Sequence, residues 1–188
     1  MNKKGFTLIE VISVIIIIGI IMIIAVPNVT QYITSSRKGS YATDIHAYIE
    51  SIRAEYEGRE YGPLLDNDEI MIVPIEGIIL EKGDSGKSPF AEYDYERSYV
   101  VIVKEKGGYQ FYANVVDKAN YGVVMTPYNL LDKDAIQENV TGLVKWSAYN
   151  GTTLGFTFNN KTYKWIDDNR IPKNTGNDSI PVLVLCEE

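Results

Sequence analysis

One apolar stretch near the N-terminus constrains this chain more than any other feature. Residues 6–26 contain ten isoleucines and are interrupted only by Thr7, Glu10, Ser13 and Gly19. A helix rises 1.5 Å per residue, so the stretch is about 30 Å long, the thickness of a bilayer core. A soluble helix does not carry isoleucine on every face. The stretch is therefore expected to span a membrane.

The charges around the stretch predict its orientation in the membrane and include one carboxylate that needs a partner. Lys3 and Lys4 precede it, which places the N-terminus in the cytoplasm and exports the remainder of the chain. Glu10 lies near its start, and an isolated carboxylate is costly in hydrocarbon, so it needs a positive partner. Cleavage after Gly5 would supply one, because the new amino group on Phe6 would carry a positive charge.

Two simpler interpretations of the stretch are a secretory signal peptide and a plain uncleaved anchor. A signal peptide needs small residues before its cleavage site. The apolar stretch ends in Ile-Ile-Ala-Val-Pro at residues 23–27, which fits that requirement poorly. The uncleaved anchor is therefore the serious alternative.

The residues around Gly5 resemble a known processing signal. Lys-Gly-Phe-Thr-Leu-Ile-Glu at residues 4–10 is similar to the class III signal of type IV prepilins and of the pseudopilins of type II secretion and competence systems. The resemblance implies that a membrane-embedded prepilin peptidase cuts between Gly5 and Phe6 and methylates the amino group of Phe6. It makes Glu10 the carboxylate used in assembly.

The resemblance continues to residue 27, and Gly19 and Pro27 correspond to the residues that weaken the helix of these pilins. The implied organisation is a leader at residues 1–5, a transmembrane and polymerisation helix at 6–27, and an extracytoplasmic globular domain at 28–188. The implied partners are the prepilin peptidase, other pilin subunits, the pilus assembly machinery and membrane lipid. Pro27 lacks a backbone N–H, so a bend or local melting is expected there.

Beyond Pro27 the apolar residues keep the spacing of an amphipathic helix, expected over residues 28–58. The stripe consists of Tyr41, Ile45, Tyr48, Ile49, Ile52 and Tyr56, and Gly58 and Gly62-Pro63 supply its stop. Strand patterns follow. The expected strands are residues 70–73, 77–80, 99–104, 109–116, 122–126, 143–149, 153–158, 161–166 and 181–186, with a short helix at 132–140 and loops at 83–89 and 174–179.

This order of a long helix followed by antiparallel strands predicts an α+β, pilin-like fold in which the helix packs on the sheet. Two of the predicted hairpins turn at Gly107-Gly108 and at Asn150-Gly151. A further turn is expected at Asn159-Asn160. We find no internal repeat and no linker to a second domain.

Composition excludes some functions. The net charge of −7 makes the chain a poor generic binder of nucleic acid, so no direct nucleic-acid partner is expected. Cys186 is the only cysteine, so no disulfide can form within one chain.

Enzyme and metal motifs are weak. Residues 83–88 resemble the end of a phosphate-binding loop and the start of a serine nucleophile loop, but Glu81 replaces the first glycine and Pro89 forbids the helix start. His46 is the only histidine and lies on the predicted amphipathic helix, so by itself it supports no role as a metal ligand or catalytic base. The acidic runs at residues 66–69 and 167–169 could hold a calcium ion, because oxygen-rich loops suit it, but they lack the spacing of an EF-hand. We therefore expect no enzyme activity, cofactor or metal site.

Among three possible functions, the sequence favours a filament subunit. Such a chain would be a single-pass protein of the cytoplasmic membrane that moves into an extracellular filament at the cell surface. The alternative is a single-span anchored binding module that does not polymerise, but it has no use for the chemistry of Phe6 and Glu10. An enzyme is the least supported. The sequence does not separate a major pilin, a minor pilin and a pseudopilin, nor adhesion, motility, secretion and DNA uptake.

Overall fold

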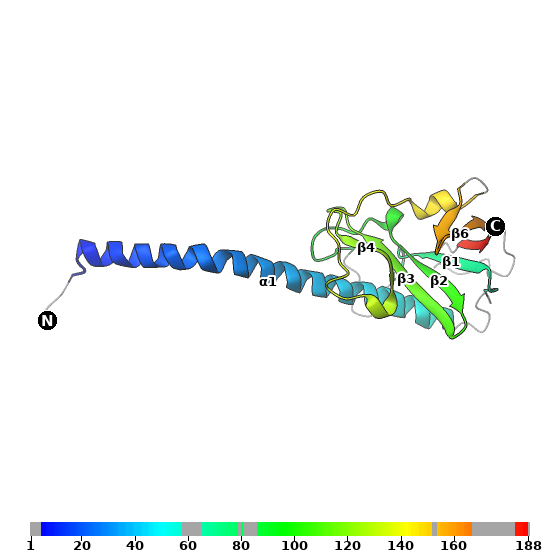
Figure 1. The fold of residues 1–188 in the computed structure, drawn as a ribbon, viewed down its shortest axis with the longest axis horizontal. Coiled ribbons are helices and arrows are strands. Elements are labelled where there is room, and N and C mark those ends of the chain that lie inside the picture. Colours follow the sequence, from blue (N-terminus) through cyan, green and yellow to red (C-terminus); the bar gives the residue numbers. More distant parts are fainter. Residues whose placement is uncertain are drawn as a thin grey trace. The chain divides into compact units, whose positions relative to one another are not determined.

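The fold was analysed in a computed structural model that describes residues 5–57, 65–78, 80, 86–151, 154–166 and 183–187. The chain divides into two units, Met1–Arg37 and Lys38–Glu188. They share the helix α1 (Leu8–Glu57), which is the long N-terminal helix expected from the sequence. Figure 1 shows α1 and the labelled strands of the second unit.

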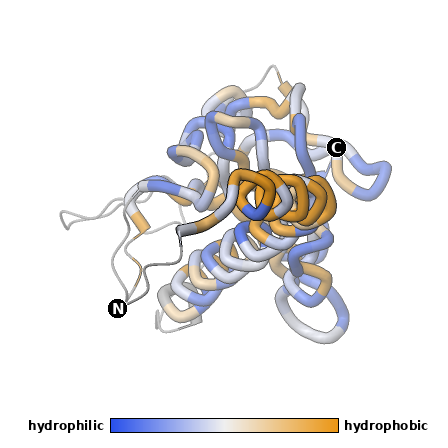
Figure 2. The backbone as a smooth tube through the Cα atoms, turned by 90° about the vertical axis from the view of Figure 1, so that its left-hand side faces the viewer, coloured by the Kyte–Doolittle hydropathy of each residue, from blue (hydrophilic) through white to orange (hydrophobic). Residues whose placement is uncertain are grey.

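The first unit is the apolar half of α1. Its large apolar side chains are all exposed, from Leu8 at 78% to Ile33 at 44%. Figure 2 shows the same residues as a hydrophobic run along the start of the helix. The helix is long and apolar enough to cross a membrane. The described residues therefore leave this surface for lipid or for other chains to cover.

In the second unit, the amphipathic stripe of α1 packs on the sheet as expected. Tyr41, Ile45, Tyr48 and Ile49 are fully buried and Ile52 is nearly so. They belong to one hydrophobic cluster with residues from one face of the sheet. The side chain of Tyr56 lies outside the described part. Burial of one helix face against a sheet is what stabilises a helix of this pattern.

The described strands form one antiparallel sheet with the order β4-β3-β2-β1-β7-β6-β5. The α+β architecture is thus confirmed and is consistent with a pilin-like fold. Figure 1 shows β4, β3, β2 and β1 side by side. The strands are β1 (Glu69–Pro74), β2 (Tyr99–Glu105), β3 (Gly108–Val116), β4 (Gly122–Pro127), β5 (Phe156–Phe158), β6 (Lys161–Trp165) and β7 (Leu183–Glu187).

Strand β7 lies in the sheet between strands β1–β4 on one side and strands β5 and β6 on the other. It pairs with β1 through Ile70–Leu185 and with β6 through Trp165–Leu185. The β2–β3 hairpin is confirmed, but it turns at Lys106-Gly107, since Glu105 already pairs with Gly108. The β5–β6 hairpin turns at Asn159-Asn160 as expected. Both asparagines have positive φ, at 49° and 62°, as a two-residue hairpin turn requires.

Side chains alternate between two cores, one on each face of the sheet. Met71 and Val73 of β1 face the cluster that contains α1, whereas Ile70 and Ile72 face a second cluster. The second cluster is closed by aromatic residues from β5, β6 and the 3-10 helix η3 (Trp146–Tyr149). It consists of Ile70, Ile72, Tyr99, Val101, Val103, Tyr149, Phe156, Phe158, Tyr163, Leu183 and Leu185.

Two predicted elements are wrong. Residues 132–140 form turns instead of a short helix. The Asp132 carboxylate accepts the N–H groups of Asp134 (2.8 Å) and Ala135 (3.0 Å) as a helix cap would, but the backbone of Gln137 then pairs with Gly122 instead of continuing a helix. Residues 143–149 are not a strand, so the hairpin expected at Asn150-Gly151 is absent from the described residues. That segment ends in η3, which places Tyr149 against Tyr99 and Phe156.

Other expectations are met in part. The predicted strand at 77–80 is a turn at Gly77, which has φ +82°, and its residue 79 lies outside the described part. Two further 3-10 helices, η1 (Tyr95–Arg97) and η2 (Tyr128–Leu130), were not expected. The predictions for residues 58–64, 81–85, 152–153 and 167–182 fall largely or wholly outside the described residues.

Candidate functional site

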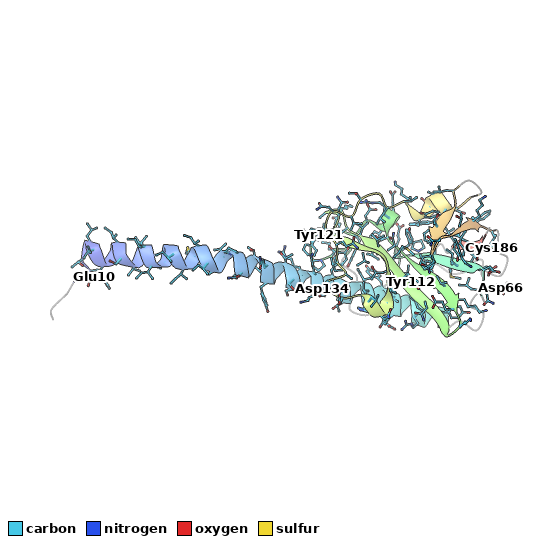
Figure 3. The ribbon with its side chains drawn as sticks, viewed as in Figure 1. Glu10, Asp66, Tyr112, Tyr121, Asp134 and Cys186 are labelled. Carbon is cyan, nitrogen blue, oxygen red and sulfur yellow. The ribbon has the colours of Figure 1, made fainter. Side chains whose placement is uncertain are left out.

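The start of α1 is organised by a reciprocal hydrogen-bond pair between Thr7 and Glu10. The Thr7 backbone N–H and hydroxyl both donate to Glu10 Oε2, at 2.7 Å and 2.8 Å. The Glu10 backbone N–H approaches Thr7 Oγ1 at 3.4 Å. Two backbone donors that a helix start leaves unpaired thereby gain partners. Figure 3 shows Glu10 in the first turn of α1.

This pair makes Thr7 the N-cap of α1, a role that the sequence interpretation missed. The signal was present, because Thr7-Leu8-Ile9-Glu10 has the spacing of a capping box ahead of an apolar run. The cap also explains why the helix begins at Leu8. Gly5, Phe6 and Thr7 therefore lie before the helix, and the Phe6 side chain is 86% exposed.

The Thr7 bonds satisfy Glu10 as an acceptor but do not neutralise its charge. Hydroxyl and amide groups donate hydrogen bonds without carrying a positive charge. Among the described residues no cation forms an ion pair with Glu10. A carboxylate in this apolar stretch therefore still needs a cation from elsewhere when water is excluded.

Three other polar side chains of the apolar half of α1 bond to the helix itself. Ser13 donates to the carbonyl of Ile9 at 2.7 Å, and Asn28 Nδ2 donates to the carbonyl of Ile24 at 3.0 Å. The Thr30 hydroxyl donates to the carbonyl of Pro27 at 2.8 Å. These groups are satisfied without a partner chain. Glu10 therefore differs from them in kind, since only its charge calls for one.

The remaining predicted site residues lie along the same helix. Gly19 lies about three turns into α1, and nothing lies within 4 Å of a Cβ added to it. Pro27 lies inside α1, which stays helical on both sides of it. The helix flexibility assigned to Gly19 and Pro27 therefore stays a prediction. The structure groups Gly5, Phe6 and Glu10 at the helix start and leaves Gly19 and Pro27 farther along.

The residues that prompted enzyme interpretations have structural roles. The Ser88 hydroxyl donates to the buried Asp117 carboxylate at 2.6 Å. The His46 Nε2 lies 2.7 Å from the carbonyl oxygen of Leu131, so this nitrogen carries the proton and donates. Its ring also meets Tyr128 edge-on at 4.7 Å. Ser88, the last residue of the run that resembles a phosphate-binding loop, and His46 are thus engaged with different partners, whereas Ser85, the serine of the nucleophile-like run, lies outside the described residues.

Cys186 and the acidic run near it show no reactive chemistry. Burial raises the pKa of the Cys186 thiol, and the nearby carboxylates of Glu69 and Asp68 raise it further. Such a thiol is a poor nucleophile at neutral pH. Within the described ranges, no group of three or more histidine, cysteine, aspartate or glutamate side chains is placed to hold a metal ion. The acidic run at 167–169 lies outside those ranges.

Comparisons with known proteins agree on the N-terminal region. The model of the prokaryotic N-terminal methylation motif matches residues 1–26. The ComG operon protein 3 homolog of Bacillus licheniformis is 36% identical over 62 residues, which cover 31% of this chain and 64% of the relative. The competence protein ComGC of Bacillus subtilis is 37% identical over 62 residues, covering 31% and 63%.

The chain thus spans less than two thirds of the length of these curated relatives. No solved structure gives a significant match to it. The matched motif and the names of these relatives give no support to an enzyme. Residues 1–26 therefore match the prokaryotic N-terminal methylation motif, the class III signal of prepilins to which the sequence around Gly5 is similar.

Proposed function

We propose that this chain is a structural subunit of a type IV pilus-like filament, of the competence pseudopilus kind. The methylation motif supports a prepilin, and the names of the two Bacillus relatives support a competence system. The subunit would be processed, stored in the cytoplasmic membrane with its N-terminus inside, and then assembled into an extracellular filament.

In this proposal a prepilin peptidase cuts between Gly5 and Phe6 and methylates the new amino group. The helix start supports this, because the capping box sets the first helical residue at Leu8 and leaves the scissile bond outside the helix. An exposed, non-helical peptide is more accessible to proteolysis than a hydrogen-bonded one. The leader would be residues 1–5, and the mature chain would begin at Phe6.

The exposed apolar half of α1 is the observation that carries the proposal. From Leu8 to Ile33, none of its large apolar side chains is buried by the described residues. Such a surface is stable in lipid or against apolar surfaces of other chains. Residues 6–27 would therefore serve twice, as the membrane anchor of the stored subunit and as the contact between subunits. The domain beyond it would be extracytoplasmic.

Glu10 would direct the joint between subunits. The amino group of Phe6 on a neighbouring subunit is the cation that the resemblance implies, and it would neutralise the charge that Thr7 leaves uncompensated. A charge pair that repeats at each joint also fixes the register between subunits. Gly19 and Pro27 would let the helix adapt as the subunit leaves the membrane.

The test compares filament yield for wild type, Glu10→Val and Ser13→Ala in cells that carry the assembly machinery and use this protein as the main subunit. Glu10→Val makes the span more apolar, so it should be cut and retained in the membrane, yet assemble poorly. Ser13→Ala removes a hydroxyl that bonds to its own helix, so it should assemble normally. Sheared filaments are counted by electron microscopy beside a membrane-fraction blot.

Wild-type filament yield from Glu10→Val would refute the role given to its charge. Absence of filaments from the wild type, with the protein cleaved and present in the membrane, would favour the alternative of an anchored binding module.

A further inference from the structure

The turns of α1 that follow the apolar span have two faces of opposite character. Val29, Tyr32 and Ile33 recur at helical spacing on one face, and they are 54%, 76% and 44% exposed. The opposite face is polar throughout and consists of Thr30, Gln31, Thr34 and Ser35. The apolar face is therefore a continuation of the exposed membrane-spanning surface along one side of the helix.

A basic residue, Arg37, lies on one flank of this face, beyond its last apolar residue. Arg37 follows Ile33 by four residues, about 40° around the helix from it and about 140° from Tyr32, and its side chain is exposed. Within the described part of the chain, no carboxylate forms an ion pair with Arg37. Its neighbour Lys38 lies on another side of the helix and pairs with Glu138 at 3.1 Å. The two adjacent cations are thus used differently, and that of Arg37 is available to a ligand.

The helix geometry brings this face close to the bilayer surface. At 1.5 Å per residue, Tyr32 lies about 9 Å beyond Val26 along the axis, and Arg37 about 16 Å. Side chains on a helix lean towards its N-terminus, which here is the membrane side, and a long arginine reaches several ångströms back. Average helix tilt of about 20° lowers the face further. The Arg37 guanidinium can therefore reach the headgroups.

We propose that Arg37 binds a phospholipid headgroup on the non-cytoplasmic leaflet through a contact of its guanidinium with the phosphate, while Tyr32, on the other flank of the apolar face, places its ring at the boundary between acyl chains and water. This inference rests on the proposed membrane residence of the subunit. A guanidinium donates to phosphate in a planar, two-pronged geometry, and tyrosine is enriched at membrane interfaces. Anionic headgroups are the preferred ligand, because their net charge attracts the unpaired cation.

A lipid fits these observations better than a second copy of the chain. Continuity of the exposed apolar surface from Leu8 to Ile33 places the same environment, lipid, against all of it in the stored subunit. The cation at its end then meets a layer of phosphate groups. A contact with another copy at this face is instead one of the outcomes that the experiment distinguishes.

The test uses the full-length protein in nanodiscs of phosphatidylcholine with one quarter phosphatidylglycerol. Native mass spectrometry after release counts the phosphatidylglycerol molecules that each monomer retains. Arg37→Gln should weaken phosphatidylglycerol binding about fivefold, the effect of one basic residue at a charged surface. Lys38→Gln is the matched control, with the same charge change one residue on, and it should behave as wild type. Added salt should lower retention in the wild type but not in Arg37→Gln.

Equal retention by wild type and Arg37→Gln, or equal loss in Arg37→Gln and Lys38→Gln, would overturn the inference. Chemical crosslinking in the same nanodiscs detects a contact between two copies. If Arg37→Gln loses crosslinked dimers but keeps its lipid retention, the face belongs to a second copy and the inference is overturned. In each case the protein is in the bilayer, so the proposed filament subunit still stands. A protein that does not enter the nanodisc would contradict the proposed membrane residence as well as the lipid site.

Discussion

The buried carboxylate of Asp117 offers a stability test of the globular domain. Its side chain is fully buried and accepts three hydrogen bonds. Oδ1 accepts the backbone N–H groups of Ala119 at 2.9 Å and Tyr121 at 3.0 Å, and Oδ2 accepts the Ser88 hydroxyl at 2.6 Å. Figure 3 labels Tyr121, whose loop this carboxylate fixes. The residue thus joins the β3–β4 turn to the segment that contains Ser88.

Asp117→Asn keeps the size of the side chain but replaces Oδ2 by an amide nitrogen, which cannot accept. The Ser88 hydroxyl cannot simply turn away, because its oxygen already accepts the N–H groups of Phe90 and Ala91, both at 3.0 Å. One buried donor is left unpaired, which costs about 1–3 kcal/mol. A loss of about 2 kcal/mol corresponds to a fall in Tm of about 4–8 °C for a domain of this size.

Thermal unfolding of a fragment of residues 36–188, followed by circular dichroism, measures this fall. Asp134→Asn is the matched control, because Asp134 is exposed and the same change there should stay within about 0.5 kcal/mol. Ser88→Ala should cost less in the Asp117→Asn background than in the wild type, since the two residues form one network. An unchanged Tm in Asp117→Asn, or additive costs of the two substitutions, would refute the reasoning.

Two further predictions concern the same fragment. Residues 36–188 lack the exposed apolar half of α1, so the fragment should be a soluble monomer by size-exclusion chromatography, with a Tm that a reductant does not change; filaments or a stable large oligomer would contradict this. Burial raises the pKa of Tyr41 and Tyr99, so both stay neutral in the folded state while the unfolded chain ionises near pH 10. The contribution of these two neutral tyrosines to the free energy of unfolding is therefore fully present below about pH 10. Above that pH the free energy of unfolding should fall by about 1.4 kcal/mol per pH unit for each buried tyrosine. Absorbance at 295 nm beside circular dichroism from pH 9 to 12 checks this, and complete tyrosine ionisation in a still folded domain would disprove it.

Elements with local patterns were predictable from the sequence. The stripe from Tyr41 to Ile52 has helical spacing, and these residues are buried against the sheet. Two apolar runs around paired glycines predict the β2–β3 hairpin, although the observed turn lies one residue before the predicted one. In both cases the signal lies within a few residues of the structure that it determines.

The elements that failed depend on contacts distant in sequence. Residues 143–149 carry apolar and aromatic side chains as a strand would, yet the described sheet offers them no partner strand, and Tyr149 instead packs on Tyr99. Residues 132–140 begin with acidic residues as a helix would. The Asp132 carboxylate closes a local turn there, and the backbone of Gln137 bonds to Gly122 in both directions.

The order of the strands in the sheet could not be predicted from the sequence patterns. Strand β7 inserts between β1 and β6, and the pairing of Met71 with Val184 has no local signal. At the candidate site, the sequence identified Phe6 and Glu10 through their chemistry, whereas the capping role of Thr7 was missed. The capping box depends only on four consecutive residues, so its signal is local and present in the sequence.

Intact-mass analysis of the membrane-extracted protein tests the central claim most directly. The protein is produced with and without a prepilin peptidase, and a Gly5 variant with a bulky side chain serves as the uncleavable control. The account predicts a mature chain that begins at Phe6 and carries one added methyl group on its amino terminus, only when the peptidase is present. An uncleaved chain in the presence of an active peptidase, or a mature terminus near Val26, would contradict it.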